Sequence, residues 1–174
     1  EEKKKATLDE VFEDIPVSKN VFIDHFSGDK LLGDAVPHEL EYEDTIMEFV
    51  SGSLGQTNGI LKYFNLQKKE VTKKQYMGHV KAFLPKIKEK VPENKRADFQ
   101  KGCTTFVKYV IDKWDNLKFY EGASGSADGG IVILNKDRTF WIFADSVKKT
   151  KAWKSAFIYQ HLLVFYLSGF WGFG

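Results

Sequence analysis

The stretch FYEGASGSADGGIVIL, residues 119–134, decides the fold of this 174-residue chain. Four glycines, two serines and an aspartate lie between an aromatic pair and an aliphatic run. A phosphate-binding loop would need GxxxxGK[ST], or GxGxxG leading from a strand into a helix. Neither spacing is present, and IVIL is typical of a strand. The sequence therefore predicts a strand connection with Asp128 and Gly129 as its turn pair, and with Gly129 or Gly130 supplying positive φ.

Apolar, β-rich runs continue on both sides of this loop. LKFY (117–120) precedes it, and the turn sequence NKDR (135–138) separates IVIL from TFWIF (139–143). Short apolar runs separated by turn residues predict an antiparallel meander.

Upstream of the meander, the sequence predicts an antiparallel helical hairpin at about residues 72–117. Thr72 and Gln75 form a capping box at the start of the first helix, and Pro85 is expected to kink that helix. Pro92 is expected to start the second helix, where its fixed φ is tolerated. The apolar positions at helical spacing are Tyr76, Val80, Phe83, Ile87 and Val91, then Phe99, Cys103, Phe106, Val110, Trp114 and Leu117.

The first third of the chain is less regular. Residues 20–26 and 45–50 carry the β-branched and aromatic mixture of strands. Residues 27–44, rich in turn residues and acids, predict a mobile loop, and residues 51–59 (SGSLGQTNG) predict another flexible stretch. Strands, then a helical hairpin, then strands indicate the α+β class.

Four segments resemble the translationally controlled tumour protein family. They are LDEVFEDI (8–15), FNLQKKEVTKKQY (64–76), LKFYEGASGSADGGIVIL (117–134) and TFWIFADSVKKTK (139–151). The third is similar to the family's C-terminal signature, although Ala123 stands where the family favours Glu. The resemblance covers roughly residues 7–151.

The resemblance implies a fold and a set of roles. The fold is a β-tent core of mixed and antiparallel strands, related to a GTPase-associated zinc-binding fold but without zinc, with the helical hairpin inserted. The roles are calcium binding, microtubule association, cell growth and survival, and regulation of Ras-like small GTPases, without an established catalytic activity. We therefore expect a family-like domain at residues 1–151, an apolar extension at residues 152–174, and no enzyme.

Charge is distributed unevenly along the chain, although the formal net charge is only +2. Residues 6–50 hold twelve acids and two lysines, whereas residues 68–118 hold fourteen Lys or Arg and six acids. A basic outer face of the hairpin could meet the acidic tails of tubulin or an anionic membrane; a solvated helix face is the alternative. Nucleic-acid binding is not expected, because no aromatic residues interleave with the basic ones. The residues expected on this face are Lys73, Lys74, Lys81, Lys88, Lys95, Arg96, Lys101 and Lys108.

Two acidic groups are further candidate sites. Glu10, beside Asp9, matches the family acid proposed to contact the GTPase, where it could pair with a basic residue of a switch region. The acidic cluster in the loop could bind calcium weakly, although the spacing of an EF-hand is absent. Its carboxylates are Glu39, Glu41, Glu43 and Asp44. Solvated acidic loops are the alternative at both places, and no cofactor is expected to be required.

The sequence gives little support for catalysis or for transition-metal binding. Cys103 is the single cysteine, which excludes an internal disulfide and a multi-cysteine zinc site. Its place on an apolar stripe favours a core role. The four histidines lack ligand spacing, and Ser124 and Ser126 lack the pattern of a nucleophile elbow.

The final segment, residues 155–174, is SAFIYQHLLVFYLSGFWGFG. Twenty largely apolar residues behind four lysines could span a bilayer as a tail anchor; a packed or disordered extension is the alternative. A membrane partner is expected only if this segment is an anchor. A reducing, cytoplasmic setting is expected for the domain in either case, because the chain opens without a secretory signal and has one cysteine.

Overall fold

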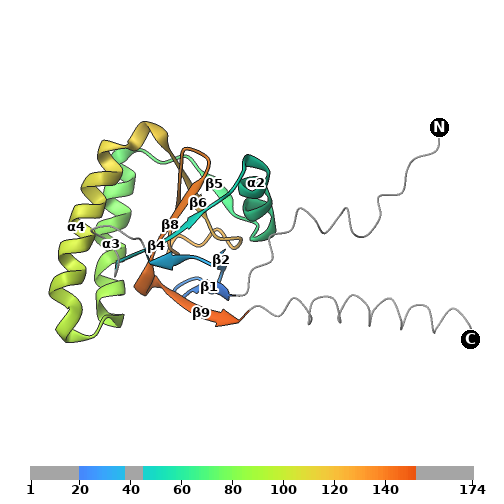
Figure 1. The fold of residues 1–174 in the computed structure, drawn as a ribbon. Helices are drawn as coiled ribbons and strands as arrows, with labels where there is room; N and C mark the ends of the chain where they lie inside the picture. Colours follow the sequence, from blue (N-terminus) through green and yellow to red (C-terminus); the bar gives the residue numbers. More distant parts are fainter. Residues whose placement is uncertain (1–19, 38–44, 152–174) are drawn as a thin grey trace, which may run out of the picture.

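The computed structural model describes residues 20–37 and 45–151, which form two antiparallel sheets, a helical hairpin and a further helix (Figure 1). The smaller sheet has the order β2-β1-β9, with β1 (Asn20–Asp24), β2 (Lys30–Gly33) and β9 (Val147–Lys151). The larger sheet has the order β3-β4-β8-β7-β6-β5, with β3 (Val36–Pro37), β4 (Ile46–Val50), β5 (Gln67–Lys69), β6 (Leu117–Glu121), β7 (Val132–Asn135) and β8 (Thr139–Phe143). The helices are α2 (Leu54–Tyr63), α3 (Lys73–Lys90) and α4 (Arg96–Asp112), with short 3-10 turns at Glu93–Lys95, Trp114–Asn116 and Ala144–Ser146.

The α+β class and the antiparallel meander are confirmed. Strands β6, β7 and β8 pair antiparallel in chain order. The β7–β8 turn uses Lys136 and Asp137, whose φ angles are 50° and 59°. Positive φ at both central residues is the geometry whose twist matches that of the flanking strands, so this tight turn sets their register.

The larger sheet is buried on both faces, which explains why its central strands have continuous apolar sequences instead of alternating ones. The α3–α4 hairpin covers one face, and the smaller sheet with α2 covers the other (Figure 1). Successive residues of β8 alternate between the two cores: Trp141 and Phe143 face the hairpin, whereas Phe140 and Ile142 face the smaller sheet. Side chains alternate in direction along a strand, so a run such as TFWIF supplies both cores at once.

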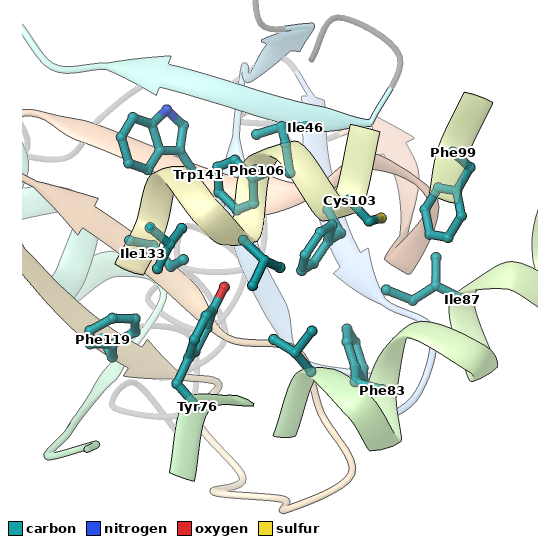
Figure 2. Close-up of a cluster of buried hydrophobic side chains, with 14 of the residues drawn as sticks. Ile46, Tyr76, Phe83, Ile87, Phe99, Cys103, Phe106, Phe119, Ile133 and Trp141 are labelled. Carbon is teal, nitrogen blue, oxygen red and sulfur yellow. The ribbon is translucent and has the colours of Figure 1, made fainter. Parts of the chain in front are cut away.

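The hairpin begins as the sequence predicts. Thr72 caps α3 in a complete capping box with Gln75, and α3 runs through Pro85 to Lys90. The predicted apolar positions of both helices meet in one core, in which the Tyr76 hydroxyl points inward (Figure 2). That hydroxyl forms no hydrogen bond to any described residue, and burial raises the pKa of Tyr76.

The end of the hairpin differs from the expectation. The sequence predicts helix to about residue 117, but α4 ends at Asp112. Trp114 lies in a 3-10 turn and packs on the rings of Tyr76 and Phe119. Leu117 is already the first residue of β6. The apolar stripe therefore continues across an irregular junction, which explains why periodicity alone places the end too late.

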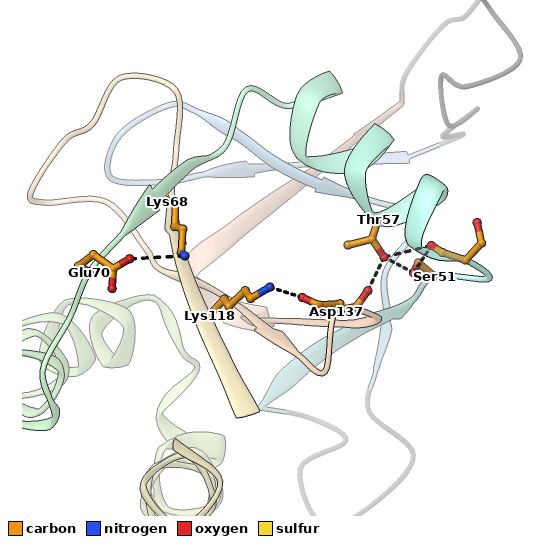
Figure 3. A network of polar contacts seen from close by, with 7 residues as sticks. Ser51, Thr57, Lys68, Glu70, Lys118 and Asp137 are labelled. Carbon is orange, nitrogen blue, oxygen red and sulfur yellow. Dashed lines mark hydrogen bonds and ion pairs between the residues drawn. The ribbon is translucent and has the colours of Figure 1, made fainter. Parts of the chain in front are cut away.

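The expectation of flexible sequence at residues 51–59 is wrong, because helix α2 begins at Leu54. Ser53 caps it by accepting a hydrogen bond from the Gln56 N–H at 3.1 Å. Thr57, which is 1% exposed, donates its hydroxyl to the Asp137 carbonyl oxygen at 2.7 Å and also contacts the Ser51 hydroxyl (Figure 3). The β7–β8 turn thus stabilises a helix whose own sequence has little helix propensity.

The expected mobile loop at residues 27–44 is wrong in its first half. Residues 30–33 form β2, which pairs with β1, and residues 36–37 form β3, which pairs with β4. Leu31 and Leu32 are almost fully buried in the core between the sheets. Residues 38–44 lie outside the described residues.

The glycine loop, residues 122–131, is the predicted strand connection, but its turn differs from the prediction. Two successive turns close it, through hydrogen bonds from the Gly125 N–H to the Gly122 carbonyl and from the Gly129 N–H to the Ser126 carbonyl. Gly125 supplies the positive φ, at 64°, and neither Gly129 nor Gly130 does. Gly129 is therefore favoured for another reason.

Candidate functional site

The carboxylate of Asp24 holds the glycine loop against the β1–β2 turn, residues 25–29. This side chain is 1% exposed. Its Oδ2 accepts hydrogen bonds from the Gly130 N–H at 2.6 Å and from the Ser27 hydroxyl at 2.9 Å, and its Oδ1 accepts one from the Phe26 N–H at 3.0 Å. Hydrogen bonds to a carboxylate are stronger than those between neutral groups. Asp24 therefore fixes the loop just before β7.

Asp29 holds the outer half of the same loop. The Ser124 hydroxyl donates to Asp29 Oδ2 at 2.6 Å, and the Ser124 N–H lies 3.3 and 3.4 Å from the two carboxylate oxygens. A Cβ atom on Gly122 would lie closer than 3.0 Å to Asp29, and one on Gly129 would lie 3.0–3.2 Å from Asp24 and Ser27. These glycines are required because two loops approach closely, which a side chain would prevent.

Helix α3 completes this junction. Lys86 Nζ lies 3.5 Å from the Asp128 carboxylate of the glycine loop. The ring of Phe26, in the β1–β2 turn, packs edge-on against Phe83 with centroids 5.1 Å apart. The His79 ring stacks on the Phe83 ring, with the ring centroids 5.0 Å apart and an angle of 24° between the ring planes. We call the contact of the glycine loop, the β1–β2 turn and α3 the loop junction.

The chemistry near this core does not favour catalysis. Burial, with a smaller contribution from Asp145, raises the pKa of the Cys103 thiol to about 12, so the thiol stays protonated and is a poor nucleophile. Burial, then Lys69 and Lys86, lowers the pKa of His79. The buried Nε2 of His79 has no hydrogen-bond partner among the described residues. In residues 20–37 and 45–151, no group of three or more His, Cys, Asp or Glu is placed to hold a metal ion.

The basic face predicted on the hairpin is mostly exposed to solvent, and two of its members also hold the hairpin together. Arg96 is half-buried, and its Nε donates to the backbone oxygens of Lys88 (3.2 Å) and Val91 (3.1 Å), which closes the end of α3. Lys88 Nζ donates to Gln100 Oε1 at 3.2 Å and so links α3 to α4. The remaining residues of the face are exposed; they are Lys73, Lys74, Lys81, Lys95, Lys101 and Lys108.

The other predicted site residues lie outside the described residues. These are Asp9 and Glu10 of the proposed GTPase contact, Glu39, Glu41, Glu43 and Asp44 of the proposed calcium site, and the apolar segment 155–174. Across the described part of the chain, no helix combines the length and the apolar character needed to cross a bilayer.

Sequence reasoning missed Asp24 and Asp29. The run DHFSGD (24–29) contains a signal for them, because Asp and Ser at turn positions often bond to nearby backbone N–H groups. That signal explains the bond from Asp24 to Phe26 within the turn. It could not identify Gly130, which lies 106 residues further along the chain.

Comparison with known proteins shows that much of the chain is similar to one family. The family model described as translationally controlled tumour protein matches residues 41–148. A homologue from Dictyostelium discoideum is 31% identical over 104 residues, which cover 55% of this chain and 60% of that protein. Homologues from Debaryomyces hansenii and Saccharomyces cerevisiae are 28% and 29% identical, and each match covers 66% of this chain and 86% of the relative.

The fold is likewise similar to a solved structure. The structure of a translationally controlled tumour-associated protein from Schizosaccharomyces pombe matches with a TM-score of 0.62 and 20% identity, covering 76% of this chain and 99% of that one. This likeness confirms the mixed α+β fold with antiparallel sheets and a helical hairpin.

The hydrogen bonds to the Asp24 carboxylate predict a large loss of stability when this carboxylate is replaced by an amide. Asp24→Asn keeps the shape of the side chain but places an amide NH2 group, a donor, against at least one N–H or O–H donor. We expect a loss of about 3 kcal/mol in the free energy of unfolding, because the site is buried and the acceptor was charged. The more exposed Asp29→Asn should lose only about 1 kcal/mol. Urea unfolding measures both, and equal losses would refute the special role of Asp24.

Proposed function

Because this chain belongs to the translationally controlled tumour protein family, we propose that it is a non-catalytic, cytoplasmic interaction protein that acts in cell growth and survival. Its partners are acidic protein surfaces, the tails of tubulin among them, which bind the outer face of the helical hairpin. The raised pKa of Cys103 and the absence of an orienting partner for His79 among the described residues support a role without catalysis.

The observation that carries the microtubule proposal is the exposed basic face. Lysines lie on both helices at positions away from the buried stripe, so their ammonium groups are free of the core packing. The hairpin is also firmly closed by Arg96, which holds the two helices in one arrangement. A rigid surface of like charge increases the rate and the specificity of binding to an oppositely charged partner.

Charge reversal tests this surface. Replacing Lys74, Lys81, Lys101 and Lys108 by Glu should lower co-sedimentation with microtubules by about tenfold or more, because attraction becomes repulsion. A control variant with Glu at Lys30, Lys62, Lys149 and Lys151, which are also exposed, has the same change in net charge. Equal losses in the two variants would show that only net charge matters. Retention in the hairpin variant would refute the proposed surface.

Regulation of a Ras-like small GTPase is a second proposal, supported by the segment LDEVFEDI (8–15). The carboxylate of Glu10, with Asp9 beside it, would pair with a basic residue of a switch region. In a pull-down with nucleotide-free and GTP-loaded GTPase, Glu10→Ala should reduce capture, whereas Glu13→Ala in the same acidic segment should not. Absence of capture by the unmodified chain, or equal capture by both variants, would count against this role.

Weak calcium binding is a third proposal, and it rests on the carboxylates Glu39, Glu41, Glu43 and Asp44. Without EF-hand spacing we expect a Kd of about 10⁻⁴ M or weaker. Calcium titration calorimetry should lose its signal when these four residues become amides. The matched control converts Glu89, Asp98, Asp112 and Asp115, exposed acids of the hairpin, to amides. Loss of the signal in the control as well would contradict a specific site.

A further inference from the structure

A second group of basic side chains lies where the end of α3, the β1–β2 turn and β9 meet. Its members are Lys90 at the end of α3, His25 in the turn and Lys148 on β9, and all three are exposed. This cluster differs from the hairpin lysines proposed above to bind tubulin, because only Lys90 belongs to the hairpin, whereas Lys148 lies in the smaller sheet.

The contacts around His25 determine where the three residues of the cluster lie. Lys90 Nζ lies 5.7 Å from the ring centroid of Phe26, the residue after His25, and the Phe26 ring is held in turn by Phe83. On the other side, the His25 N–H donates to the Ser146 carbonyl at 3.0 Å. Lys148 stands opposite Ile23 in the β1–β9 ladder, two residues before His25. Three separate elements therefore bring basic side chains to one place.

The Asp24 carboxylate favours the charged form of His25 but forms no ion pair with Lys90 or Lys148. Asp24 is buried, and its oxygens accept hydrogen bonds from Phe26, Ser27 and Gly130. Neither Lys90 nor Lys148 forms an ion pair with another residue in the described ranges. Uncompensated positive charges that come from separate elements create a local field that attracts an anion.

We propose that Lys90, His25 and Lys148 form a binding site for a phosphate monoester dianion. The two ammonium groups and the imidazolium N–H would donate to the phosphate oxygens, as charge-assisted hydrogen bonds. Burial, then Lys90, with a smaller effect of Lys148, lowers the pKa of His25, and Asp24 opposes this. A bound dianion would raise the pKa of His25 again, so binding and protonation of His25 favour each other.

The phosphate could come from a small soluble molecule or from a lipid headgroup. Lys148 lies only seven residues before the apolar segment that starts at Ser155, and residues 146–174 contain no Asp or Glu. A cationic site in such a sequence context suits the anionic surface of a membrane. The shared chemistry is the phosphate group, so the experiment treats the two sources separately.

The first measurement is an NMR titration of His25 in the full chain. Inorganic phosphate should shift the His25 ring resonances and raise the pKa of His25. Sulfate keeps its charge across this pH range, so any change of its affinity with pH reports the protonation of His25. The affinity for sulfate should fall as the pH rises through the pKa of His25. A His25 resonance unmoved by either anion would contradict a soluble source, and together with the absence of lysine-dependent flotation described below it would overturn the proposal.

Variants assign the effect to the cluster. Lys90→Gln and Lys148→Gln should each weaken phosphate binding by about fivefold, and His25→Gln should remove the pH dependence of sulfate affinity. Lys74→Gln and Lys108→Gln, on the hairpin face, should leave the phosphate affinity unchanged. Equal weakening by the hairpin variants would mean general charge attraction and would refute a site.

Vesicle flotation separates the two sources. Flotation that requires both a phosphatidylinositol monophosphate in phosphatidylcholine vesicles and the two lysines supports a headgroup source. Phosphate binding in solution without such flotation supports a soluble source. The proposed site is refuted if two results occur together. The first is that no phosphate or sulfate binds in solution. The second is that flotation is absent, or is unchanged in the Lys90→Gln, Lys148→Gln double variant. None of these outcomes depends on microtubule binding.

Discussion

The hydrogen bond from the Gly130 N–H to the carboxylate of Asp24 is the constraint on which the rest of the structure depends. Asp24 ends β1 in the smaller sheet, and Gly130 lies just before β7 in the larger one. The bond therefore joins the two sheets at the point where α3 also packs, through Phe26 on Phe83. Moving the glycine loop away from this buried carboxylate would break a hydrogen bond to a charged acceptor, which opposes any other arrangement of the loop. Glycine at residue 129 follows from this approach, since a Cβ atom would press on Asp24 and Ser27.

The described part of the molecule has an apolar interior and a charged periphery. Both faces of the larger sheet are covered, and the buried Cys103 and Tyr76 lie within the hairpin core. The exposed charged groups include the lysines of α3 and α4 and the cluster of Lys90, His25 and Lys148. The site proposals for this family member accordingly rest on surface charge, whereas the family's signature loop serves the fold.

Much of the fold could be predicted from the sequence, because much of it is encoded locally. The capping box at Thr72, the 3.6-residue periodicity of α3 and α4, and the runs of β6 to β8 were sufficient for the hairpin and meander. Helix α2 was missed because its stability comes from Thr57 contacting Asp137, 80 residues away. Strand β2 was missed because its short LL pair becomes a strand only by pairing with β1. Of the site residues, exposed lysines could be predicted from helical spacing, but Arg96 closes the hairpin and Asp24 has its partner in a distant loop.

Hydrogen exchange of the Gly130 amide tests the central claim most directly. If Asp24 holds this N–H in the buried junction, its exchange should require global unfolding, and its exchange free energy should equal that of the β7 amides at the centre of the sheet. The Ser126 amide of the same loop donates to the Ser124 hydroxyl in an exposed hydrogen bond that is long, at 3.4 Å. This amide should therefore exchange much faster. Gly130 exchange as fast as that of Ser126 would contradict the account, because the loop would then open without disturbing the rest of the fold.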